Sequence, residues 1–321
     1  MKKLIIALSA LGAAFTATAK ADISVSGSAN VAYLSTSGAA GNGQEELLVG
    51  QTIAFGMSTT TSTGLGIAGS MTISQDYDAD GGNNATGGQA VTFTTGGATI
   101  VVGDVEISDT TGAIGGTVNG PLDDASDLDT SVASGFLDDD GLGIELTSAV
   151  GAASLNISYV SNDDDNNFGI VNSSAATANS AMSASITMPM GAYSVTLGVA
   201  DSDTGENSAG ASVSGSIGGG TVTVGYSSQT LTADHADLTT AGDSEVVGAT
   251  YSMSLDADTT IALGYQSAKD ADSESATQTD LSVERALGGG ATVYLDLRNL
   301  TGDTAANADG TAIGFGTSVA F

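Results

Sequence analysis

Carboxylates dominate the chemistry of this 321-residue sequence, which has 37 acidic and only 6 basic side chains. The stretch DYDADG, residues 76–81, has the alternating aspartates that open a calcium-binding loop. An EF-hand would need glutamate at the twelfth position, which is Gly87, so that motif is excluded. A looser calcium site among loop carboxylates stays open, with a solvated acidic loop as the alternative. The candidate ligands are Asp76, Asp78, Asp80, Asp138, Asp139 and Asp140.

Catalytic groups are scarce. The sequence has no cysteine, and its one histidine, His235, sits in the polar stretch TADHADL with no nucleophile elbow around any serine. The glycine clusters Gly96–Gly97 and Gly218–Gly220 precede no helical pattern, so they are turns and not phosphate-binding loops. We therefore predict that the protein is not an enzyme and that it requires no cofactor, with bound Ca²⁺ as the open case.

The amino-terminal residues have the features of an export signal. Lys2 and Lys3 precede an apolar run from Leu4 to Phe15, and small residues follow in ATAKA. Residues 1–21 are predicted to be a cleaved signal peptide and residues 22–321 the mature domain. Cleavage removes three of the six basic residues and takes the net charge from −31 to −34. So acidic a chain repels nucleic acid, which we exclude as a partner.

The apolar residues recur with a period of two, which predicts β-strands throughout. Large side chains alternate with small or polar ones from Leu65 to Asp76, from Ala192 to Ala200 and from Thr292 to Arg298. The apolar set on these strands includes Ile67, Met71, Val195, Leu197 and Leu295, and elsewhere Leu146 and Leu263. No helical period appears outside the signal. The fold class is all-β.

Short and long connections alternate along the chain, which sets the number of strands. Tight turns are predicted at residues 61–64, 96–97, 151–152, 189–191, 218–220, 256–258 and 288–290. Longer polar connections fall at residues 36–47, 78–88, 108–141, 163–178, 202–206, 232–242, 269–276 and 302–309. This pattern predicts sixteen strands of about 10 residues, enough to cross a bilayer when tilted. It is also compatible with fourteen or eighteen strands.

Several segments together resemble the general porins of Gram-negative outer membranes, especially the alphaproteobacterial type. They are DISVSGSANVAYL after the signal, STGLGIAGSMTI, GGATIVVGDVEI and the terminal TAIGFGTSVAF. The resemblance implies a transmembrane antiparallel barrel of about sixteen strands, with short periplasmic turns and long extracellular loops. It implies a homotrimer in outer-membrane lipid, with the third loop, residues 108–141, folded into the lumen as the constriction. It also implies that Phe321 is the signal read by the barrel-assembly machinery.

The third loop contains many acids and no base, including Asp109, Asp123, Asp124, Asp127 and Asp129. Strand parity is expected to add Asp104, Glu106, Asp296 and the one lumenal base, Arg298. Arg285 is expected on the lipid face near a turn, and Lys269 opens a loop. The family usually carries an arginine and lysine cluster on the wall opposite this loop, which this sequence lacks. A net negative pore follows, and with it a preference for cations.

Two functions fit these observations. The first is an outer-membrane channel for passive diffusion of small hydrophilic solutes, selective for cations. The second is an acidic, calcium-stabilised surface or adhesion β-protein without channel activity. The strict alternation of loop lengths and the terminal Phe321 favour the channel.

Overall fold

The computed structural model describes residues 22–38, 45–77, 83–106, 140–162, 179–202, 207–231, 242–269, 275–302 and 309–321. These residues contain no helix of the length and apolarity needed to cross a membrane. Their regular structure consists of sixteen strands. The strands are β1 (Asp22–Gly38), β2 (Glu45–Thr60), β3 (Gly66–Tyr77), β4 (Asn83–Thr95), β5 (Ala98–Glu106), β6 (Asp140–Val150), β7 (Ala153–Asn162), β8 (Asn179–Met190), β9 (Tyr193–Ser202), β10 (Asn207–Ile217), β11 (Gly220–Leu231), β12 (Gly242–Ser254), β13 (Thr259–Lys269), β14 (Ser275–Gly288), β15 (Ala291–Gly302) and β16 (Gly310–Ala320).

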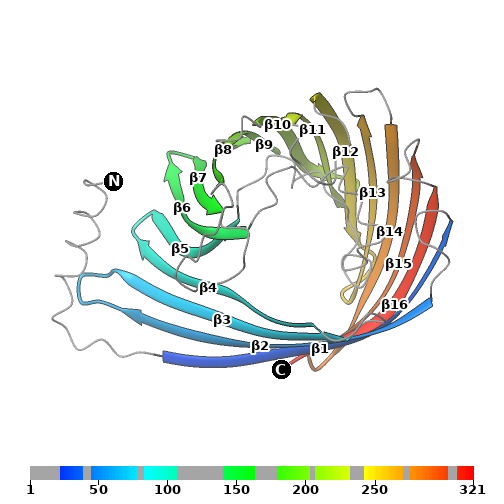
Figure 1. Ribbon diagram of the computed structural model, residues 1–321, viewed down its shortest axis with the longest axis horizontal. Coiled ribbons are helices and arrows are strands. Elements are labelled where there is room, and N and C mark those ends of the chain that lie inside the picture. Colours follow the sequence, from blue (N-terminus) through cyan, green and yellow to red (C-terminus); the bar gives the residue numbers. More distant parts are fainter. Residues whose placement is uncertain are drawn as a thin grey trace.

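The strands form one closed barrel in which each pairs with its neighbours in sequence and β16 returns to pair with β1. Figure 1 shows the strands following one another in chain order around a ring. Every pairing is antiparallel, including β1 with β16, where Ser28 lies opposite Ala320. The predicted fold class and the predicted number of strands are both confirmed.

Seven tight turns each join an even-numbered strand to the strand that follows it, from β2–β3 to β14–β15. They fall where the glycine and polar pairs predict them. Gly64, for example, has φ of 83°, a conformation that favours glycine in a tight turn. The long connections alternate with these turns. The predicted constriction loop, residues 108–141, lies almost wholly outside the described residues, so its place in the barrel stays a prediction.

The strands differ in length more than the sequence pattern indicates. The shortest is β5, with 9 residues, and β1 and β2 have 17 and 16 residues. About 10 residues suffice to cross the hydrocarbon layer, so the excess extends beyond it. Outward positions near the end of β1, such as Ser35 and Ser37, are accordingly polar. The expectation of about 10 residues per strand was wrong for β1 and β2, because the polar residues at the end of β1 and the start of β2 were assigned to the connection at residues 36–47.

The outer face of the barrel is apolar, as the two-residue period predicts. Met71, Leu197, Leu263 and Leu295 are exposed on it, together with many other large apolar side chains. Ile67, Leu146 and Val195, at equivalent positions in their strands, are partly covered. In water this exterior would be an aggregation surface, whereas in a bilayer it contacts lipid.

β1 begins at Asp22, the residue expected to open the mature chain. Residues 1–21 lie outside the described residues, and the signal peptide stays a prediction.

Candidate functional site

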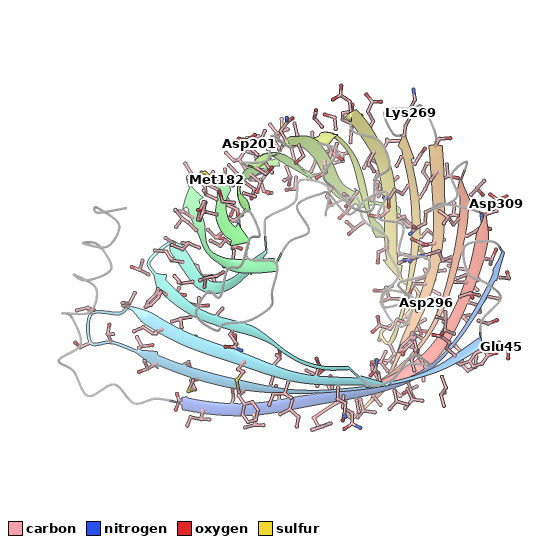
Figure 2. The ribbon with its side chains drawn as sticks, viewed as in Figure 1. Glu45, Met182, Asp201, Lys269, Asp296 and Asp309 are labelled. Carbon is pink, nitrogen blue, oxygen red and sulfur yellow. The ribbon has the colours of Figure 1, made fainter. Side chains whose placement is uncertain are left out.

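A polar cluster lies on the inner face of β13, β14 and β15. Asp280 lies opposite Arg298 in the β14–β15 register, and Ser282 lies opposite Asp296. Directly opposed residues share a face. All four side chains are buried, in contrast to the exposed Leu295 on the other face of β15. Figure 2 shows Asp296 on the wall toward the interior of the ring, whereas Lys269 is at the rim.

Asp280 and Arg298 form a buried ion pair. The Arg298 Nε donates to Asp280 Oδ1 at 3.2 Å, and the side chains are 7% and 2% exposed. The Gln278 Nε2 donates to the other oxygen, Asp280 Oδ2, at 2.7 Å. Both carboxylate oxygens of Asp280 are therefore satisfied, and its charge is balanced by the guanidinium.

Asp296 has a different environment on the same wall. The Ser282 hydroxyl donates to Asp296 Oδ1 at 2.6 Å. The other oxygen, Oδ2, is buried and has no hydrogen-bond partner. Asp296 itself is 0% exposed. One carboxylate of the cluster thus has half of its acceptor capacity unused.

Further polar and acidic groups lie around the inner face. Glu145 of β6 accepts a hydrogen bond from Thr147 at 3.1 Å, and Asn156 donates to Thr147 at 3.2 Å. The hydroxyls of Ser158 and Ser183 bond to each other across β7 and β8. The register also places Glu46 and Glu284 on this face, opposite Leu34 and Tyr294. A small apolar cluster on β5, β7, β8 and β9 is formed by Val105, Val160 and Ala200 with Val101 and Ala181.

Three basic residues follow position 21, and one of them faces inward. That residue is Arg298. Lys269 is exposed at the end of β13, opposite Glu245. Arg285 is exposed on the outer face of β14, next to the β12–β13 turn. Its guanidinium donates a hydrogen bond to Thr259 Oγ1 at 2.7 Å and lies 3.5 Å from Asp256 Oδ2. The inner face therefore has a single positive charge, which Asp280 neutralises.

Many of the predicted site residues lie outside the described residues. This holds for Asp109, Asp123, Asp124, Asp127 and Asp129 of the third loop, and for the candidate calcium ligands Asp78, Asp80, Asp138 and Asp139. Asp76 is near the end of β3 and Asp140 begins β6, but their side chains are not among those described. In the part of the chain that the structure describes, no three histidine or carboxylate side chains are grouped to hold a metal ion.

Asp104 and Glu106 belong to β5, and their side chains are also outside the described set. The β5–β6 register pairs Asp104 with Leu142, which is exposed, and Glu106 with Asp140. Their expected place on the lumen wall stays a prediction, which this register does not favour. The register runs through β5 without a shift, so Asp104 and Glu106 have the same parity as Ile100 and Val102, which lie opposite Leu146 and Ile144.

Sequence reasoning did not single out Ser282, Gln278 or Gln266. Serine and glutamine are common on any polar strand face, so residue type does not mark them. Ser282 and Gln278 could have been found by parity, because they lie two residues on either side of Asp280 on the same face of β14. Gln266 of β13 lies opposite Gln278, so only the strand pairing reveals it.

The sequence also identifies the family. A profile of Gram-negative porins matches residues 7–305. The chain belongs to the Gram-negative porin family. This porin is therefore a protein of the bacterial outer membrane.

Solved structures agree with this assignment in fold. A porin refined at 1.8 Å resolution is 19% identical and superposes with a TM-score of 0.67, covering 94% of this chain and all of its own. The anion-selective porin of Comamonas acidovorans is 15% identical, with a TM-score of 0.67 and the same coverages of 94% and 100%. OmpF of Salmonella typhi, in complex with daunomycin, is 13% identical, with a TM-score of 0.70, covering 93% of this chain and 97% of its own. No curated protein was found to match the chain.

Proposed function

We propose that this porin is a water-filled channel for passive diffusion of small hydrophilic solutes, and that it prefers cations. The proposal is based on the charge of the inner face. Glu145, Glu284 and Asp296 on this face are acidic. The one basic residue that faces inward, Arg298, is paired with Asp280. Acidic rings favour cations in a narrow aqueous pore. We propose no enzymatic activity.

The fold alone does not set the sign of selectivity, since one structural relative is an anion-selective porin. The sign must come from the side chains of the interior. Here the third loop would add Asp109, Asp123, Asp124, Asp127 and Asp129 to the negative wall if it folds inside. This loop contains no basic residue that would oppose them.

The test is the reversal potential of the reconstituted protein in a planar bilayer across a KCl gradient. We expect the potential to have the sign of cation selectivity at low salt. Selectivity should weaken near 1 M, where the screening length falls to about 3 Å. A potential of the opposite sign at low salt would refute cation preference.

Assembly and metal binding belong to the same proposal. We propose a homotrimer inserted by the barrel-assembly machinery in outer-membrane lipid; one structural relative, OmpT of Vibrio cholerae, is described in a trimer form. We also propose Ca²⁺ binding by loop carboxylates, with Asp76, Asp78 and Asp80 or Asp138, Asp139 and Asp140 as ligands. The soluble adhesion alternative is disfavoured by the closed barrel and its apolar exterior.

A further inference from the structure

Arg285 lies where the apolar outer face of the barrel meets a tight turn. It is opposite Thr259, the first residue of β13, and opposite Val293 of β15. One outward step further from the turn, β14 and β15 present Val283 and Leu295, which lie opposite each other. An arginine in this position keeps its aliphatic stem against hydrocarbon and holds its guanidinium at the level of the lipid headgroups.

A buried threonine holds a guanidinium and a carboxylate side by side at this point. Arg285 Nη1 donates to Thr259 Oγ1 at 2.7 Å, and the Thr259 hydroxyl donates to Asp256 Oδ2 at 3.2 Å. The other carboxylate oxygen, Asp256 Oδ1, accepts from the backbone N–H of Asp258 at 2.9 Å. Thr259 is only 9% exposed. The positions of the two charged groups are therefore fixed by the turn and by the first residue of β13.

Both charges are available to a partner outside the protein. Arg285 Nη1 and Asp256 Oδ2 are 3.5 Å apart, and their side chains are 52% and 54% exposed. An exposed ion pair at that distance is weak. Both hydrogen bonds that the guanidinium makes within the described part of the chain use Nη1, so Nε and Nη2 remain as donors. The neighbouring Asp258 is exposed as well.

We propose that Arg285 and Asp256 bind the headgroup of a phospholipid that carries both a phosphate and a primary ammonium, as phosphatidylethanolamine does. The guanidinium donates to the phosphate, and the carboxylates of Asp256 and Asp258 accept from the ammonium. Val283 and Leu295 beside them offer apolar surface to the acyl chains. An anionic headgroup without an amine meets two carboxylates for one guanidinium and is disfavoured, and a trimethylammonium has no N–H to donate. The inference rests on the membrane-spanning barrel and is independent of the proposed cation preference.

The experiment measures lipid binding to the assembled porin in detergent by native mass spectrometry. The probes are phosphatidylethanolamine, phosphatidylcholine and phosphatidylglycerol with identical acyl chains. We expect the wild type to bind phosphatidylethanolamine at least about threefold more tightly than either of the other lipids, because the contacts are charge-assisted but exposed. Arg285→Gln should remove this preference. Arg285→Lys should keep part of it, since lysine retains the positive charge without the planar fork of donors.

Lys269→Gln is the matched control, because Lys269 is an exposed base at the opposite end of β13. It removes the same charge from the other rim of the barrel, so its lipid preference should equal that of the wild type. Asp256→Asn removes a carboxylate and keeps the guanidinium, so it should lower the affinity for phosphatidylethanolamine relative to phosphatidylglycerol. This variant also tests the site should Arg285→Gln not assemble, as judged by heat-dependent SDS mobility.

The outcomes separate this site from the proposed function. Equal affinity of the wild type for the three lipids overturns the site, and so does an equal loss of preference in Lys269→Gln, since general surface charge would then explain the effect. Tightest binding of phosphatidylglycerol would show a phosphate contact without recognition of the amine, which also overturns the proposal. An anion-selective channel that keeps the preference for phosphatidylethanolamine would refute the proposed cation preference and leave the lipid site intact.

Discussion

The ring of Phe321, the last residue of the chain, lies against Gly27 of β1. The two residues exchange a pair of backbone hydrogen bonds, each 2.9 Å long. A Cβ atom added to Gly27 would come within 2.7 Å of the Phe321 Cε2. Phe321 thus extends the β16–β1 pairing that closes the barrel, and Gly27 leaves room for its ring.

Deleting Phe321 should reduce barrel assembly more than Phe321→Ala. Deletion removes the two backbone hydrogen bonds as well as the ring, whereas alanine keeps the backbone groups. The measurement is the yield of heat-modifiable barrel on SDS gels of outer membranes. Equal yields for wild type, Phe321→Ala and the deletion would show that the terminal residue has no part in assembly.

Gly27→Val should lower barrel stability through the ring of Phe321. The valine side chain requires the ring to move, and overpacking of this kind typically costs about 1–3 kcal/mol. Urea unfolding in detergent measures the loss. Combining Gly27→Val with Phe321→Ala should recover part of it, because the clashing ring is then absent; a purely additive double variant would contradict this account.

Leu197→Arg should impair assembly. Leu197 is 42% exposed on the apolar outer face of β9, and arginine near the bilayer midplane costs about 2–4 kcal/mol. Thr196→Arg is the matched control, since Thr196 lies on the inner face and bonds to Thr187 at 3.0 Å. If Leu197→Arg assembles normally and Thr196→Arg does not, the two faces have been assigned the wrong way round.

Arg298→Gln should destabilise the barrel by about 3–5 kcal/mol, because it leaves the buried carboxylate of Asp280 without its counter-charge. The double variant Asp280→Asn with Arg298→Gln should be closer to the wild type, since neither charge then remains. Thermal unfolding, followed by SDS mobility, compares the stability of the single variant and of the double variant with that of the wild type. A single variant as stable as the double variant would show that the pair is not energetically coupled.

Asp256 should make the β12–β13 turn sensitive to acid. The backbone N–H of Asp258 and the Thr259 hydroxyl donate to its carboxylate, and with nearby Arg285 they hold the pKa of Asp256 below its ordinary value. A lowered folded-state pKa stabilises the protein above the ordinary value, and this contribution is lost as pH falls through the folded-state pKa. Asp256→Asn should therefore be less stable than wild type at pH 7 and equal to it in strong acid. The midpoints of urea unfolding of both proteins at several pH values check this. A stability difference between wild type and Asp256→Asn that grows as the pH falls would contradict a lowered pKa of Asp256.

The barrel was predictable because lipid and interior impose a strict alternation on every strand. Pairs such as Thr196 and Leu197 show their faces directly in the sequence. Inner-wall chemistry was only partly predictable. Parity put Arg298 inward, but a sequence does not show that Asp280 binds it or that Asp296 remains unpaired, since both depend on the register between β14 and β15. Residue type can also mislead, because Asp104 and Glu106 are acidic and yet the unshifted β5–β6 register gives them the parity of the apolar Ile100 and Val102.

Closure of the sheet leaves this porin with no strand edge once β16 has reached β1. Every earlier stage of assembly has two edges, whose unpaired backbone groups can recruit strands of other chains. Aggregation through strand edges is thus confined to the time before the carboxyl-terminal strand docks. Because β1 and β16 lie at opposite ends of the sequence, their pairing has the longest sequence separation among the strand pairs of the barrel, and non-local pairings of this kind slow folding.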